Sequence, residues 1–158
     1  LPDPADATTV DLRSQARTTF SIVTPAPIRV QASFGFAATE ISGHRAINVH
    51  PDSDIWVPPP AGATRIIIEF GIVPGAYTAT DHDPTDGVEF IVDGELPGAT
   101  TRTLYSRLLD PAKNAADRAV QSQTFEYQPR PGETLVFRTR PGATASFDWA
   151  FWQRIAVE

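Results

Sequence analysis

Three carboxylates crowd one short polar stretch of the chain. Asp81, Asp83 and Asp86 lie in Asp81-His82-Asp83-Pro84-Thr85-Asp86-Gly87, directly before an apolar run. Calcium takes oxygen ligands, and aspartate-rich loops supply them. These three side chains are therefore the predicted metal ligands, with calcium as the candidate cofactor. The stretch lacks the full ligand spacing of an EF-hand, so a solvated loop whose Asp side chains form turns is the alternative.

Aromatic rings offer a second kind of chemistry, because the C–H face of a sugar packs on an indole or phenol ring. The candidates are Trp56, Tyr77, Tyr105, Trp149 and Trp152. Trp149 and Trp152 belong to the closing apolar run, which favours a place in the core. Trp56 and Tyr77 lie beside proline-rich or aspartate-rich turns. They are the predicted ligand-binding rings, and the carboxylates of the acidic stretch are expected to bond sugar hydroxyls.

Hydrolytic chemistry has little support in the sequence. Glu89 and Asp93 share one face of a predicted strand, but four residues span about 13 Å, farther apart than the paired carboxylates of a glycosidase. The chain has no cysteine, no Gly-x-Ser-x-Gly elbow and no phosphate-binding glycine loop. The three histidines, at 44, 50 and 82, fit no local metal pattern. We expect no catalytic residues, and a small glycan hydrolase is the least favoured function.

The candidate carboxylates and aromatic rings must be positioned by the secondary structure, which the sequence shows as short apolar runs separated by turn signals. The runs cover residues 28–36, 44–49, 54–57, 64–73, 88–93, 101–109, 121–127, 134–139 and 149–157. Eight to ten short strands with turns every 8–12 residues, and at most one short helix near 111–120, predict an all-β protein. The expected architecture is a jelly-roll β-sandwich of two antiparallel sheets. Asp93-Gly94 predicts one hairpin turn, and residues 129–132 predict a second between the runs 121–127 and 134–139.

The closing run has bulky side chains on both faces. By the two-residue period, Trp149, Phe151, Ile155 and Val157 share one face, and Trp152 lies on the other. Such a strand is expected at the centre of a sheet. The phase of the apolar residues on the strands predicts one shared core. Its members are Ile66, Ile68, Phe70, Val88, Phe90, Val92, Leu135, Phe137 and Phe151.

Length and charge bound the remaining possibilities. The 158 residues fit one domain, and a net charge of −6 opposes binding to nucleic acid or to an anionic membrane. No apolar segment approaches the roughly 20 residues of a membrane helix. Residues 1–27 are expected to form a lead-in or edge segment, and residues 28–158 a single sandwich domain. The chain lacks methionine and begins Leu-Pro-Asp-Pro, so we expect a piece of a longer polypeptide.

Several short motifs, in order, resemble a known family. They are His50-Pro51-Asp52-Ser53-Asp54-Ile55, Gly62-Ala63-Thr64-Arg65, Phe70-Gly71-Ile72, the run Gly87-Val88-Glu89-Phe90-Ile91-Val92-Asp93-Gly94, and Asp148 with Trp152. From about residue 28 to 158 the chain resembles the novel putative carbohydrate-binding module family, a branch of the galactose-binding-domain-like jelly rolls. Residues 74–86 and 110–120 depart from its pattern.

That resemblance implies a non-catalytic accessory domain of a larger extracytoplasmic protein, binding or presenting a glycan. Neighbouring domains of the polypeptide are the other expected partners. A purely structural protein-interaction domain without a sugar site is the alternative, because these motifs mostly build the sandwich.

Overall fold

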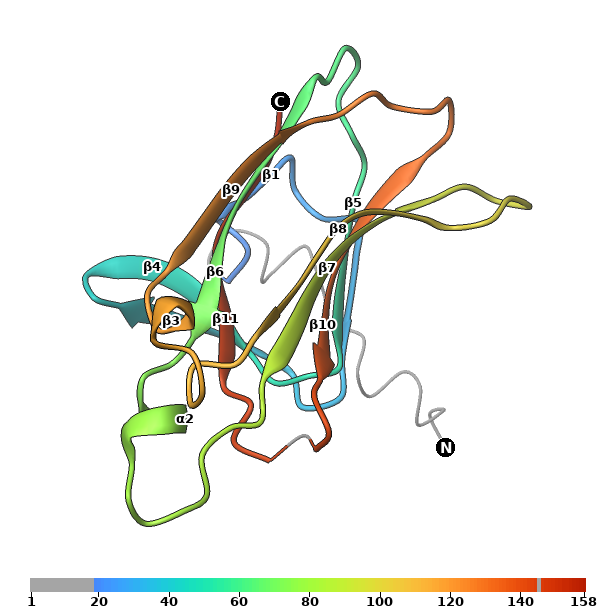
Figure 1. The fold of residues 1–158 in the computed structure, drawn as a ribbon. Coiled ribbons are helices and arrows are strands. Elements are labelled where there is room, and N and C mark those ends of the chain that lie inside the picture. Colours follow the sequence, from blue (N-terminus) through green and yellow to red (C-terminus); the bar gives the residue numbers. More distant parts are fainter. Residues whose placement is uncertain (1–18, 145) are drawn as a thin grey trace, which may run out of the picture.

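The computed structural model describes residues 19–144 and 146–158, which form two facing β-sheets (Figure 1). One sheet has the order β3 (Phe36–Ile41), β4 (His44–Val49), β11 (Ala150–Val157), β6 (Arg65–Ile72) and β9 (Gln121–Glu126), with β1 (Val23–Thr24) parallel to β11. The other has the order β2 (Arg29–Ala32), β5 (Ser53–Val57), β10 (Thr134–Pro141), β7 (Val88–Glu95) and β8 (Arg102–Leu109). The predicted all-β sandwich is confirmed.

Helical structure is brief in the described chain. It consists of α2 (Gly75–Thr78) in the connection between β6 and β7, and the 3₁₀ turn η2 (Ala115–Asp117) between β8 and β9. No helix within residues 19–144 and 146–158 has the length and apolar character of a membrane span.

The core lies between the sheets, where alternate residues of each strand point inward. Eight of the nine predicted core side chains, those of β6, β7 and β10, are fully buried in one cluster. Trp152 of β11 also lies in this cluster, with its ring centroid 5.3 Å from Phe90 and 5.9 Å from Phe70. Its strand is central in the six-stranded sheet, as expected.

The ninth predicted core residue, Phe151, is placed wrongly by the two-residue period. The pairing of β11 with β6 shifts between Trp152 and Arg154, which is a β-bulge. A bulge inserts an extra residue and reverses the phase of the strand beyond it. Trp152 and Ile155 therefore both reach the core. Phe151 is buried opposite Gly71, outside the main cluster.

The hairpin predicted across residues 129–132 is wrong, whereas β7 and β8 do form an antiparallel hairpin whose turn comes later than Asp93-Gly94. β9 pairs with β6 in one sheet, whereas β10 pairs with β5 and β7 in the other, so residues 127–133 cross between the sheets. Asp93 and Gly94 lie within β7, and the turn follows at residues 96–101. Gly94 is required there for another reason: the carboxylate of Glu133 occupies the space that a Cβ would fill.

Two neighbouring crossovers connect the sheets beside the core. Residues 33–35 lead from β2 to β3, and residues 50–52 lead from β4 to β5. The Ser33 N–H donates to the Asp52 carbonyl at 3.0 Å, which ties the two segments together. Together they form a ridge, here called the double crossover, between the ends of the two sheets.

Residues 19–27 also take part in the sandwich. Phe20 is 1% exposed and packs edge-on against Phe36 at 5.3 Å, and Val23 of β1 is buried. Residues 19–27 of the predicted lead-in thus add a short strand and core side chains to the sandwich, and residues 1–18 lie outside the described chain.

Candidate ligand-binding site at one end of the sandwich

Loops that are distant in the sequence meet at the end of the sandwich that carries α2, the lower end in Figure 1. The Gly142 N–H donates to the Gly87 carbonyl at 3.0 Å, and the Thr144 N–H donates to Asp86 Oδ2 at 2.5 Å. Thr85 Oγ1 donates to Asp148 Oδ1 at 2.5 Å. These bonds join the β6–β7 connection to the β10–β11 connection. The surface between them is therefore held by the tertiary fold and not by one loop alone.

An aromatic cluster is built on these two connections. The rings of His82 and Phe147 stack with centroids 3.8 Å apart and planes 6° apart. Trp149 meets both edge-on, at 5.5 Å from His82 and 5.7 Å from Phe147. Gly75 of α2 lies against the indole, because a Cβ there would be in van der Waals contact with Trp149 Cζ3 at 3.4 Å. Phe147 has φ +58°, a conformation that costs free energy in a bulky residue and often marks functional loops.

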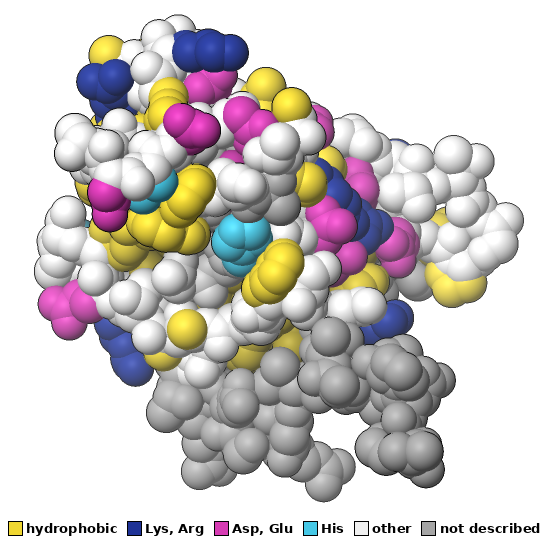
Figure 2. Space-filling model, turned by 90° about the horizontal axis from the view of Figure 1, so that it is seen from below, with side chains coloured by type: hydrophobic (Ala, Val, Ile, Leu, Met, Phe, Trp, Pro, Cys, Tyr) yellow, Lys and Arg dark blue, Asp and Glu magenta, His cyan; other side chains and the backbone are white. Residues whose placement is uncertain are grey.

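A shallow hollow of about 160 Å³ lies between this cluster and the double crossover, and we call it the aromatic hollow. Its lining includes Phe34, Asn48, His50 and Trp149. Phe34 is 69% exposed and Trp149 is 37% exposed, and the Phe34 ring meets His50 edge-on at 4.6 Å. Figure 2 views the molecule from this end and shows histidines among hydrophobic side chains.

The polar groups of the aromatic hollow can donate and accept hydrogen bonds. His50 Nδ1 lies 3.1 Å from the Pro51 carbonyl, which can only accept, so Nδ1 carries the hydrogen. In a neutral His50, Nε2 is then left as an acceptor. The Asn48 amide supplies both donor and acceptor atoms. Exposed rings beside such groups suit a ligand with one apolar face and several hydroxyls.

Asp148 lies beneath this surface and has a raised pKa, but its surroundings indicate a structural role. Burial is the main cause that raises the pKa of Asp148 to about 6; the Asp86 carboxylate adds to the rise, and the hydrogen bond from Thr85 opposes it. The residue is fully buried, and Oδ2 has no hydrogen-bond partner among the described residues. A general acid must reach the glycosidic oxygen of its substrate. A carboxyl without solvent contact cannot do so in this arrangement.

Comparisons with known proteins return similarities of fold only. No protein-family model matches the chain, and no curated protein matches it. A similar solved structure is a CBM51 module from Clostridium perfringens GH95 in complex with methyl-galactose, at 12% identity and TM-score 0.49, covering 82% of this chain and 87% of that one.

Two further solved structures show the same level of similarity. The M60 catalytic domain with two CBM51 domains from Clostridium perfringens ZmpB has 10% identity and TM-score 0.48, covering 83% of this chain, which spans only 14% of that protein. The K2 adhesin domain of Lys-gingipain has 12% identity and TM-score 0.47, with 80% of each chain covered.

The two rings predicted to bind ligand are not brought together. Trp56 lies on the outer face of the five-stranded sheet, where the Arg29 guanidinium sits 4.4 Å from the ring centroid and Nε1 donates to Glu95 Oε2 at 3.3 Å. Tyr77 lies in α2, and its hydroxyl donates to the Arg118 carbonyl at 2.9 Å. Both rings therefore already have partners, and neither lines the aromatic hollow.

The predicted calcium ligands do not converge either. The side chain of Asp81 is 85% exposed, Asp83 is exposed, and Asp86 holds the Thr144 N–H. Within the described residues, no group of three or more His, Asp or Glu side chains is arranged to hold a metal ion. Calcium binding at Asp81, Asp83 and Asp86 gains no support from this geometry and stays a prediction.

Four residues of this end were not predicted as site residues: Phe34, Asn48, His50 and Phe147. The sequence favours a core position for Trp149, but this residue precedes β11, which begins at Ala150, and is 37% exposed. One signal was present in the sequence. Phe34-Gly35-Phe36 interrupts an alternating run with a glycine, and Gly35 has φ +82°, which turns the chain out of β2.

Proposed function

We propose that this domain is a non-catalytic accessory module that binds carbohydrate in the aromatic hollow. One observation carries the proposal: the exposed rings of Trp149 and Phe34 border a concave surface that also contains Asn48 and His50. Burying part of an indole against a sugar face is favourable, and the amide and imidazole fix the orientation of hydroxyls. The predicted rings Trp56 and Tyr77 and the acidic residues Asp81, Asp83 and Asp86 remain the alternative contacts.

The shallow hollow suggests weak binding, and the expectation that the module acts outside the cytoplasm comes from the resemblance of the sequence. A shallow, wet site holding one sugar unit supports a dissociation constant on the order of a millimolar, about −4 kcal/mol. In line with the resemblance of the sequence, the module belongs to a larger extracytoplasmic polypeptide that supplies the chemistry. Such a module gains useful avidity when its parent protein binds the same glycan elsewhere.

The carboxylates of this domain support binding in preference to hydrolysis. Glu89 accepts a hydrogen bond from Ser106, and Asp93 is held by Thr103 and Arg138. Both lie on one strand of the five-stranded sheet, away from the aromatic hollow. No hydrolysis of a bound glycan is expected, which incubation with the ligand and chromatography of the products checks.

A glycan array followed by calorimetric titration tests the proposal. Trp149→Ala and Phe34→Ala are expected to abolish or strongly weaken binding. The melting temperature of Phe34→Ala should stay close to that of the wild type because its ring is 69% exposed, whereas Trp149→Ala should lower it because the indole packs against His82 and Phe147. Trp56→Ala and Tyr77→Ala are the matched aromatic variants and are expected to bind normally. Loss of binding in Trp56→Ala and Tyr77→Ala alone would show that these two rings bind the sugar and that the aromatic hollow does not.

The second candidate is a structural interaction domain without a sugar site. Ile28 is 59% exposed and Leu108 is 55% exposed, as a protein interface would require. They lie at opposite edges of the five-stranded sheet, beside β2 and on β8, so they do not form one patch. Absence of saturable binding to every glycan tested, together with association with a purified neighbouring domain, would favour this candidate.

A further inference from the structure

We propose that the glycan site continues across the double crossover into a second, polar subsite, so that the preferred ligand has at least two sugar units. This inference rests on the proposed function and adds the subsite and the ligand length. A second hollow of about 250 Å³, the polar hollow, is lined by Gln31, Ala32, Ser33, Asp52, Asp54 and Arg140.

The two hollows lie on either side of the same ridge. Ser33 and Asp52 line the polar hollow, while Phe34 and His50, their near neighbours in the sequence, line the aromatic hollow. The Ser33–Asp52 hydrogen bond and the contact between Phe34 and His50 hold the ridge together. A chain of sugars that rests one unit on Phe34 therefore has a polar surface directly across the ridge for the next unit.

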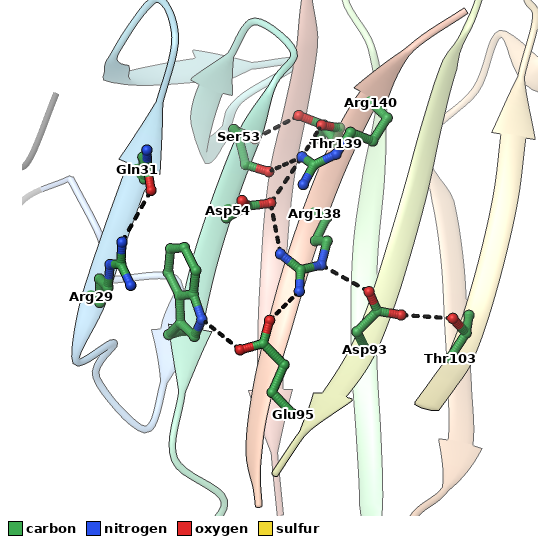
Figure 3. A network of polar contacts seen from close by, with 11 residues as sticks. Arg29, Gln31, Ser53, Asp54, Asp93, Glu95, Thr103, Arg138, Thr139 and Arg140 are labelled. Atoms are coloured by element: carbon green, nitrogen blue, oxygen red, sulfur yellow. Dashed lines mark hydrogen bonds and ion pairs between the residues drawn. The ribbon is translucent and has the colours of Figure 1, made fainter. Parts of the chain in front are cut away.

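Arg140 is the fixed donor of the polar hollow. Its Nη1 donates to the Thr139 carbonyl at 2.9 Å, to the Ser53 carbonyl at 3.3 Å, and lies 2.9 Å from Asp54 Oδ1 (Figure 3). Among the described residues, Nε and Nη2 make no hydrogen bond. A guanidinium held by one nitrogen keeps its planar set of donors in place for a ligand.

Hydrogen-bonding groups of Asp52, Ser33 and Gln31 line the polar hollow together with Arg140. The side chains of Asp52 and Ser33 make no hydrogen bond to any described residue, and both residues are exposed. Gln31 Oε1 accepts from Arg29, which leaves the NH₂ group of Gln31. A carboxylate beside a guanidinium suits a vicinal diol, in which hydroxyls donate to the former and accept from the latter. No aromatic side chain is in this lining, so recognition here is through hydroxyls.

The test compares disaccharides with their component sugars. Titrations use lactose, cellobiose and mannobiose, together with the methyl glycosides of galactose, glucose and mannose. For the disaccharide that binds, we expect about tenfold tighter binding than for its methyl monosaccharide, as one or two charge-assisted hydrogen bonds can supply. Asp52→Asn and Gln31→Ala should lower the disaccharide affinity to the monosaccharide level without changing monosaccharide binding.

Glu126→Gln, the same loss of one charge on the distant edge strand β9, is the control and should change neither affinity. Equal affinities for mono- and disaccharide, or variants that leave the disaccharide unaffected, overturn the subsite alone. Variants that weaken both ligands equally also overturn it, because the residues would then act on the whole site. A wild-type protein that binds no sugar overturns the proposed function together with the subsite.

Discussion

At the scale of single residues, Glu133 is a buried carboxylate with a full set of donors. Its side chain has no solvent contact. It accepts hydrogen bonds from Arg102 at 2.6 and 2.8 Å, from Arg130 at 2.6 Å and from the Tyr127 hydroxyl at 2.7 Å. Burial acts to raise the pKa of Glu133, but these hydrogen bonds outweigh it and lower the pKa to about 2 from the ordinary 4.5. Glu133 thus joins β8, β9 and β10 at one end of the sandwich.

The lowered pKa predicts an acid-sensitive contribution to stability. The unfolded chain binds a proton at Glu133 more readily than the folded protein, so the contribution is complete above pH 4.5 and is lost as the pH falls toward 2. The shift corresponds to about 3 kcal/mol. Glu133→Gln should lower the free energy of unfolding in urea at pH 7 and differ much less from the wild type near pH 2. A difference that does not change with pH contradicts this.

Calcium binding by the acidic loop is a separate prediction for single residues. Only weak binding is expected, because Asp81 and Asp83 are exposed and Asp86 already accepts the Thr144 N–H through Oδ2. Titration calorimetry should give heat at millimolar calcium, the melting temperature should rise, and the double variant Asp81→Asn, Asp83→Asn should lose both effects. No heat and no change in melting temperature in the wild type reject the prediction.

At the scale of elements, the contact between β6 and β11 depends on one glycine. A Cβ on Gly71 would lie 2.8 Å from Phe151 Cζ and 3.0 Å from Cε1. Gly71→Ala should therefore destabilise the protein by about 1–3 kcal/mol, as overpacking does. Chemical denaturation of Gly71→Ala, Phe151→Leu and the double variant measures the coupling. The double variant should recover part of the loss, and strictly additive effects would contradict the contact.

At the scale of the whole molecule, a substitution at Phe20 tests whether the residues before position 28 unfold together with the rest of the sandwich. This side chain precedes the predicted boundary at residue 28, yet it is buried in the core cluster. Phe20→Ala should cost about 3–5 kcal/mol, a loss comparable to that expected for Phe90→Ala. Ile28→Ala, at an exposed position, serves as the control and should cost little. An unchanged denaturation midpoint for Phe20→Ala would restore the boundary at residue 28.

The sequence by itself determined the fold class and most of the core. The side chains of Ile66, Ile68 and Phe70 alternate with polar or half-buried neighbours, as do Val88 and Phe90. That alternation is a local property of a strand with one buried face, so it is readable without knowing which strand lies beside it. The same reasoning located the central closing strand, because Phe151 and Trp152 need cover on both faces.

Only the tertiary structure decided which strands pair and where a ligand surface forms. The hairpin predicted between residues 121–127 and 134–139 is wrong because β9 and β10 pair in different sheets, which long-range packing decides. The bulge that reverses the phase after Trp152 depends on the pairing with β6. The aromatic hollow joins Phe34, His50 and Trp149, which lie up to 115 residues apart in the numbering of the chain. Such a surface has no local spacing to detect, since its residues become neighbours only when two crossovers and two loops meet.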